Sequence, residues 1–470
     1  MNDMSIKRES TRMRPTINSV LIALMMLVLA QSAPAQTAQP RPPQTMQSAQ
    51  SLVASQAALI TEFEVNGLKV IVKRREGSLS VGAGLFVKGG ARNITAQNAG
   101  IEGLTLETAT EASAAFPRAR MRDEQARMGT VIGASSHYDF SALSLRSTRL
   151  HFDRSWQLFT DVALHPSFTQ EDFTLIQQRL LSSLRDDNDN PESHLQHLHD
   201  RLAYAGHPYM NPMRGTAETV ARLTVEDVRN YHRKIMETSR LLLVIVGDID
   251  PNKIRSLVTA SFGKLPRGAY KAEPVQQLVF DKPVVEITPR ALETNYIQGY
   301  FTAPAPNSPD IYPMRIASSL LRDRVFQEVR AKRNLSYAPD AFLRNQGANI
   351  GGIYVTSDDT NQSVRLMLDE IHRLQQVAIS KDDIQGVVAQ YLTSYYIGQE
   401  TNIAQAAELA QHELLVGGWR TSLDFIDKLS AVTPEEVQRV SQKYMRNIRF
   451  VVLGDPKSVD TRVFTGATGD

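Results

Sequence analysis

Cysteine is absent from the 470-residue chain, and neither sign of charge is in excess. Without cysteine there can be no disulfide, no thiolate metal ligand and no cysteine nucleophile. The 52 lysine and arginine residues against 50 aspartate and glutamate residues give a formal net charge of +2. This balance argues against a nucleic-acid or membrane-surface partner. Beyond residue 30 no apolar run is long enough for a membrane span.

The first 35 residues have the pattern of an export signal. Basic residues between positions 7 and 14 precede the apolar run "VLIALMMLVLA" at 20–30, and Ala-Pro-Ala at 33–35 offers a cleavage site. Eleven residues rise only about 16 Å as a helix, which is short of a bilayer core of roughly 30 Å. We therefore expect a signal peptide over 1–35, and a soluble exported protein that is periplasmic in a Gram-negative source.

The rest of the chain repeats itself after a tether at 36–57 that is rich in Pro, Gln and Ser. "LTVEDVRNYHRKIM" begins at residue 223 and "VTPEEVQRVSQKYM" at residue 432, an offset of 209. Each is a threonine-capped helix that leads into a strand ending in Gly-Asp. The repeat predicts a first domain over 58–268, a linker over 269–277 and a second domain over 278–470.

Strand and helix patterns are grouped in blocks and do not alternate strictly. This grouping predicts an α+β fold, in which a domain with a largely antiparallel sheet and helices packed on one face occurs twice in tandem.

A helix is expected after the loop at residue 99, in "AGIEGLTLETATEAS", and it carries Glu102, Glu107 and Glu111. Three carboxylates on a short helix raise the question of a metal site. A zinc site without histidine or cysteine is unusual, so we interpret these glutamates as a solvated acidic face.

Several motifs in order resemble those of the pitrilysin/insulinase-like zinc peptidases, also called inverzincins. They are "FEVNGLKV" from residue 63, "HPSFTQEDF" from 165, "GHPYMNPMRGTAETVARLTVEDV" from 206 and "LLVIVGDID" from 242. The resemblance extends from about residue 60 to 456. It implies the LuxS/metallohydrolase-like peptidase fold, consistent with the duplicated α+β domains.

In that family a helix with the motif HxxEH binds zinc through two histidines, and the glutamate between them is the general base. Aligned on Gly100-Ile101, this chain has Gly103, Leu106 and Glu107 at those three positions. The region of the third ligand reads Ser-Leu-Arg at 183–185, and no glutamate occurs between 171 and 192. The resemblance thus implies that this chain binds no zinc and has no peptidase activity alone.

The second half retains another feature of the family, in "VFQEVRAKRNLSYAP" at 325–339. Arg330 and Tyr337 match the family's Arg-x₆-Tyr pair, which the resemblance implies to contact substrate. The tyrosine hydroxyl would donate to the scissile carbonyl oxygen and the guanidinium would hold a substrate carbonyl. From the residues alone, a helix-terminal arginine with a tyrosine packed beneath it is the alternative. Arg333 is assigned only a structural role.

These implications together predict the non-zinc subunit of a heteromeric periplasmic metallopeptidase. The zinc would be on the partner, a homologous subunit containing HxxEH, and the substrates would be unfolded peptides. An edge strand near Gly133 resembles the strand that pairs with substrate backbone in catalytic members. The alternative is a catalytically inactive binding or scaffold protein, and the sequence leaves homodimer and heterodimer open.

Three smaller features are interpreted as structural or solvent-exposed and not as functional sites. His194, His197 and His199 in "HLQHLH" are predicted to be solvated surface residues, with a metal site as the alternative. His207 is expected in a structural turn. The glycines of "GANIGGIYV" at 347–355 are expected to allow a tight hairpin.

Overall fold

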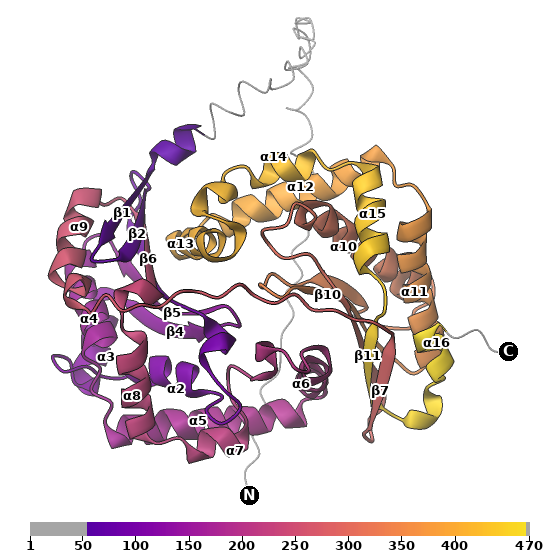
Figure 1. Ribbon diagram of the computed structural model, residues 1–470, viewed down its shortest axis with the longest axis horizontal. Coiled ribbons are helices and arrows are strands. Elements are labelled where there is room, and N and C mark those ends of the chain that lie inside the picture. Colours follow the sequence, from indigo (N-terminus) through magenta and orange to yellow (C-terminus); the bar gives the residue numbers. More distant parts are fainter. Residues whose placement is uncertain (1–53, 467–470) are drawn as a thin grey trace, which may run out of the picture. The chain divides into compact units, whose positions relative to one another are not determined.

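The structure is a computed structural model that describes residues 54–466 and contains two sheets (Figure 1). The expected signal peptide and nearly all of the tether lie outside the described residues. The first sheet has the order β1-β2-β6-β3-β5-β4 and the second the order β7-β11-β8-β10-β9. Their strands are β1 (Ile60–Val65), β2 (Leu68–Arg74), β3 (Ser80–Lys88), β4 (Val131–Ser136), β5 (Phe140–Thr148), β6 (Leu241–Gly247), β7 (Val284–Pro289), β8 (Asn295–Thr302), β9 (Asp340–Leu343), β10 (Ile350–Ser357) and β11 (Arg449–Gly454).

The two sheets have the same topology, which confirms the duplicated α+β fold predicted from the sequence. In each sheet a late strand inserts beside an early one as the single parallel pair: β6 beside β2, and β11 beside β7. All other pairs are antiparallel. Strand β1 is an addition that only the first sheet carries among residues 54–466.

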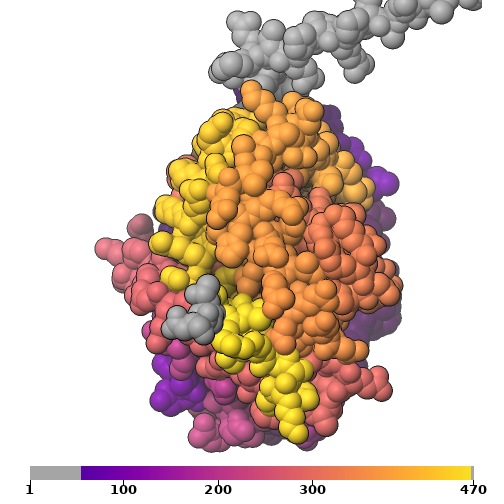
Figure 2. All heavy atoms as spheres, turned by 90° about the vertical axis from the view of Figure 1, so that its right-hand side faces the viewer, coloured from indigo at the N-terminus to yellow at the C-terminus, as the bar shows by residue number. Residues whose placement is uncertain are grey.

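Helices follow the same order in both halves, except that the helix over 118–128 has no counterpart in the second half among residues 54–466. Those of the first half are α2 (Ile101–Ala109), α3 (Arg118–Met128), α4 (Phe152–Leu164), α5 (Gln170–Asp189), α6 (Pro191–Ala203), α7 (Ala217–Arg222), α8 (Val225–Ile235) and α9 (Pro251–Ala260). Those of the second are α10 (Ile311–Val325), α11 (Thr360–Gln376), α12 (Lys381–Gly398), α13 (Asn402–Gln411), α14 (Phe425–Ser430), α15 (Pro434–Tyr444) and α16 (Thr461–Thr465). The second half, orange to yellow, makes up most of the face seen in Figure 2. No helix within 54–466 has the length and apolarity that a membrane crossing requires.

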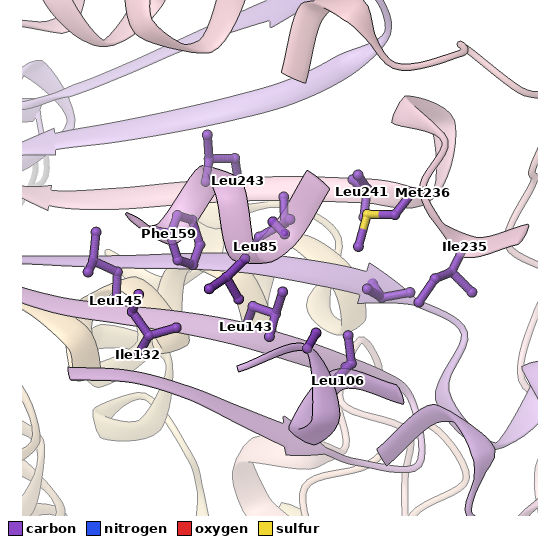
Figure 3. Packing of buried hydrophobic residues seen from close by; sticks show 14 of the residues in the cluster. Leu85, Leu106, Ile132, Leu143, Leu145, Phe159, Ile235, Met236, Leu241 and Leu243 are labelled. Carbon is purple, nitrogen blue, oxygen red and sulfur yellow. The ribbon is translucent and has the colours of Figure 1, made fainter. Parts of the chain in front are cut away.

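One face of the first sheet packs against helices of its own half. Because side chains alternate along a strand, Leu241, Leu243 and Ile245 of β6 point into this core. Figure 3 shows Leu243 there beside Phe159 of α4, and Leu241 beside Met236. Capping boxes start α8 at Thr224 and α15 at Thr433, as the repeated threonine pattern indicates.

The other face of each sheet is covered by a helix from the other half. Leu242, Val244 and Val246 of β6 share a buried cluster with Leu409 of α13, which packs on β3 and β6. In the second sheet, Val451 and Leu453 of β11 share a cluster with Leu195 of α6. The helices α6 and α13 occupy equivalent places in the two repeats, so the exchange is reciprocal. Burial on both faces explains why β6 and β11 are almost continuous apolar runs.

A buried polar network accompanies α6 in its contact with the second sheet. The ring of His199 stacks on Tyr300 with centroids 3.5 Å apart, and its Nε2 lies 2.7 Å from the carbonyl oxygen of Arg449. Arg344 pairs with Asp200 at 3.1 Å and donates to the Tyr300 hydroxyl at 2.6 Å. The interpretation of His199 as a solvated histidine is therefore wrong, since its side chain is fully buried.

Gly351 and Gly352 are required by side-chain packing against them and not by a turn of the backbone. A Cβ on Gly351 would lie 2.3 Å from the ring of Phe301, and one on Gly352 would lie 2.6 Å from Phe342. Both glycines lie within β10, and neither has a positive φ angle. The tight-hairpin explanation is wrong for these two residues, because aromatic rings of neighbouring strands occupy the space above them.

The docking of α13 predicts a dependence of stability on pH. Burial raises the pKa of Glu408 to about 7, and Lys73 opposes this shift. The folded state therefore holds a proton that the unfolded state loses above its pKa near 4.5. The free energy of unfolding should fall by about 1–3 kcal/mol as pH rises from 4.5 to 7. In urea titrations across this range, Glu408→Gln should flatten the decline, whereas Glu400→Gln, at an exposed carboxyl nearby, should keep it. An unchanged slope in Glu408→Gln would contradict the prediction.

Candidate functional site

The helix α2 begins at a glycine that no other residue could replace without strain. Gly100 has a φ of 93°, and a Cβ there would lie 2.9 Å from the carbonyl oxygen of Arg214. This turn directs α2 along the sheet and against α5 and α8. The positions at which the family carries its zinc residues follow within two turns.

Glu102 on α2 is buried, which contradicts its interpretation as part of a solvated acidic face. Its carboxylate accepts hydrogen bonds from Tyr231 at 2.6 Å, from Asn93 at 3.0 Å and from Ser141. Asn93 in turn accepts from Arg240 at 2.9 Å. Burial raises the pKa of Glu102, and the three hydrogen bonds oppose that rise. Glu102 is thus a structural carboxyl that joins α2 to β5 and α8.

Gly103, Leu106 and Glu107 do not form a metal site. A Cβ on Gly103 would already lie 3.2 Å from Ser136 Oγ on β4. Leu106 is fully buried in the core that holds Leu143 (Figure 3). Glu107 is exposed, and partial desolvation raises its pKa against the field of Arg214. Within residues 54–466, no three His, Cys, Asp or Glu side chains gather so as to hold a metal ion.

An arginine, which sequence reasoning missed, lies beside these positions. Arg214 donates to Ser183 Oγ at 2.6 Å and forms an ion pair with Asp187, both on α5. Leu184 is buried in the core and Arg185 is exposed, so residues 183–185 present no carboxylate. A guanidinium thus supplies positive charge between α2 and α5. In the sequence, the only signal for this charge is that a basic residue, Arg214, directly precedes the turn at Gly215.

Arg330 and Tyr337 lie in the second half, where α10 ends. The helix continues into a π-helical turn, η5 (Phe326–Ala331), a feature often found at functional sites. The Arg330 guanidinium carbon lies 4.1 Å from the centre of the Tyr337 ring, and the group donates to the Tyr337 carbonyl. The same carbon lies 5.3 Å from the centre of the Phe326 ring. The pair is therefore pre-formed, with the arginine in contact with two aromatic rings.

Both side chains of the pair remain available to a ligand. Tyr337 is 79 % exposed, and its hydroxyl makes no hydrogen bond to any residue that the structure describes. Arg330 has no carboxylate partner there, whereas its neighbours Lys332 and Arg333 both pair with Glu328 at 2.5 Å. The arrangement thus leaves Arg330 and Tyr337 uncommitted. No hydrogen bond or ion pair within 54–466 joins them to α2.

The remaining candidates lie apart from this pair. Strand β4, which contains Gly133, is at the edge of the first sheet and pairs only with β5 within the described range. Its outer side is therefore geometrically suited to a further strand. His207 accepts from the Tyr209 amide and contacts the carbonyl of Gln276, which is a structural arrangement. His194 contacts Arg290 at 3.1 Å.

Comparison with known proteins assigns the family. The profile of the insulinase family, peptidase family M16, matches residues 69–217, and the profile of the peptidase M16 inactive domain matches residues 222–391. The chain belongs to peptidase family M16. The M16 assignment confirms the resemblance to pitrilysin and insulinase. The M16 profile includes α2, although this chain lacks the zinc residues at Gly103, Leu106 and Glu107.

Individual M16 relatives are distant. An uncharacterized zinc protease of Streptomyces coelicolor is 24 % identical over 61 % of this chain and 66 % of its own length. The β subunit of the mitochondrial processing peptidase of Blastocladiella emersonii is 22 % identical over 83 % of the chain and 87 % of its own length. A structure described as a peptidase M16 inactive domain from Pseudomonas fluorescens superposes with a TM-score of 0.77 at 17 % identity, covering 84 % and 98 % of the two chains.

Zinc is the metal that the family implies, and the residues of α2 and α5 do not fit it. A glycine, a buried leucine and a single exposed glutamate replace the two histidines and the general base. The guanidinium of Arg214 lies beside these positions, and its positive charge would repel a metal cation bound there. No reaction step is assigned to a metal on this chain.

Proposed function

We propose that this chain is the non-zinc subunit of an exported, two-subunit M16 peptidase. In this role it binds an unfolded peptide and completes the site of a homologous partner that carries HxxEH. The observation that carries the proposal is the pre-formed pair of the half-buried Arg330 and the exposed Tyr337, whose side chains have no hydrogen-bond or ion-pair partner outside the pair among the described residues. The relative from Blastocladiella emersonii, itself named a subunit, supports a role in an assembly.

The pair has the chemistry to hold a peptide carbonyl as it gains negative charge. A tyrosine hydroxyl is a neutral donor, and a guanidinium keeps its charge at any working pH. Donors fixed before reaction need no reorganisation when charge develops on oxygen. The contacts of Arg330 with the Phe326 and Tyr337 rings, and its hydrogen bond to the Tyr337 carbonyl, provide that fixation. Strand β4 supplies a sheet edge along which an extended peptide could pair.

Reconstitution with a partner tests the proposal. The mature chain is mixed with the HxxEH relative encoded in the same genome, and hydrolysis of a fluorogenic peptide library is compared with that of each protein alone. We expect hydrolysis only in the mixture, and we expect a chelator to abolish it. Gel filtration of the mixture should show a single complex.

Two outcomes would overturn the proposal. Chelator-sensitive hydrolysis by this chain alone would show that the chain binds a catalytic metal itself. A stable complex without hydrolysis of any peptide would instead favour a catalytically inactive scaffold.

A further inference from the structure

A cavity of about 440 Å³ opens in the second half, between α10, η5, α11 and α12. Its volume is within the range of small-ligand sites. Apolar side chains such as Leu320 and Val387 form part of the lining, and the rest is largely charged. Five carboxylates and three cationic side chains line it, so the cavity favours a ligand with positive charge.

One of these carboxylates is buried and only half satisfied. Glu370 on α11 is 2 % exposed. One of its oxygens pairs with Arg373 at 3.2 Å, whereas Oε2 is buried without a hydrogen-bond partner in the described part of the chain. Burial raises the pKa of Glu370, and Arg373 and Arg324 oppose the rise. A buried acceptor left unpaired is destabilising, and a ligand that donates to it would remove that cost.

A donor in the same cavity is also unpaired. Arg324, in the last turn of α10, has its Nη1 buried with no hydrogen-bond acceptor among residues 54–466. Buried polar atoms in native proteins nearly always have partners. Two residues that line the cavity therefore carry, just beneath its surface, a carboxylate oxygen that lacks a donor and a guanidinium nitrogen that lacks an acceptor.

A glycine keeps the cavity open. Gly386 lies within α12, where glycine is less favourable than alanine because it has more backbone freedom to lose. A Cβ built on it would meet nothing within 4 Å. Packing therefore does not require glycine at this position, and any larger side chain would project from α12 at the edge of the cavity.

We propose that this cavity binds a basic side chain, lysine or arginine, of an extended peptide. The ammonium or guanidinium group donates to Glu370, and a carbonyl of the same peptide accepts from Arg324. Because no three metal-ligating side chains gather within 54–466, an organic cation fits the lining better than a metal ion. A free amine would satisfy only Glu370, whereas a basic residue within a peptide satisfies both groups. The site does not depend on a zinc-bearing partner.

The test is calorimetric titration of the whole mature chain with capped tripeptides. Acetyl-Ala-Arg-Ala-amide should bind at least 10-fold more tightly than the same peptide with citrulline, which keeps the shape of arginine and lacks its charge. Glu370→Gln should weaken the arginine peptide at least 10-fold, and Gly386→Leu should abolish its binding. Asp369→Asn and Gly398→Leu are matched controls on the same two helices and should bind as the wild type does.

Three results would overturn the proposal. They are equal affinity for the citrulline peptide, unchanged affinity in Glu370→Gln, and undiminished binding in Gly386→Leu. Agmatine, a guanidinium compound without a carbonyl, distinguishes the source of the cation. If agmatine binds as tightly as the arginine peptide, the assignment to a peptide is wrong.

Discussion

Replacing Tyr337 by phenylalanine should lower kcat/KM of the reconstituted complex by 100-fold or more. Removal of one pre-positioned donor to a developing oxyanion typically costs a factor of 10² to 10³. The Tyr337 side chain is exposed, and the phenylalanine ring of the variant would keep its contact with Arg330. Folding and assembly should therefore be unchanged, and the loss should appear mainly in kcat. Steady-state hydrolysis of the best library peptide measures it.

Tyr396→Phe provides the matched control, because Tyr396 is also in the second half and is 64 % exposed. It should leave kcat/KM within a factor of two. Arg330→Lys keeps the charge and loses the planar group that contacts the two rings, so it should raise KM. Full activity in Tyr337→Phe would remove this residue from the site, even if the complex itself proved to be a peptidase.

The second large effect is expected at Leu106, where glutamate would reinstate one residue of the lost motif. Leu106 is fully buried among aliphatic side chains. An unpaired carboxyl there should destabilise the protein by about 3–5 kcal/mol at neutral pH, because a buried charge without a partner is poorly compensated. The loss should shrink at low pH, where the carboxyl is protonated and uncharged. Urea unfolding at pH 7 and pH 5 measures both effects.

Leu106→Met is the control for volume, and it should cost less than about 1.5 kcal/mol. The triple variant Gly103→His, Leu106→Glu, Glu107→His carries the full motif, yet we expect it to bind less than one zinc per chain. The crowding of Gly103 against Ser136 and the guanidinium of Arg214 both oppose a metal there. A stable triple variant with stoichiometric zinc would show that the site was lost by substitution alone.

The duplication and the strand and helix content could be predicted from the sequence because they depend on local signals. Threonine caps such as Thr224 and Thr433 and apolar strands such as β6 are visible within a dozen residues. The absence of HxxEH is likewise visible in the sequence, because it depends on the residue types at three positions only.

Contacts between distant segments could not be predicted in the same way. The sequence predicts a solvated His199, because nothing near this residue in the chain indicates its contact with Tyr300, a residue of the other half. Glu102 was grouped with exposed glutamates, although its partners Tyr231 and Ser141 come from elements far along the sequence. Arg214 and Glu370 have no motif at all, since their significance depends on which atoms the fold leaves beside them.

The reciprocal covering of the sheets by α6 and α13 has a consequence for the order in which the protein matures. When the first half has been synthesised, the face of the first sheet that carries Leu242 and Val244 of β6 is still exposed, because α13 does not yet exist. That cover, which includes Leu409 and Trp419, is translated only after most of the second half. Either half expressed alone should therefore aggregate and be poorly soluble. Co-expression of the two halves as separate polypeptides should restore the solubility of both.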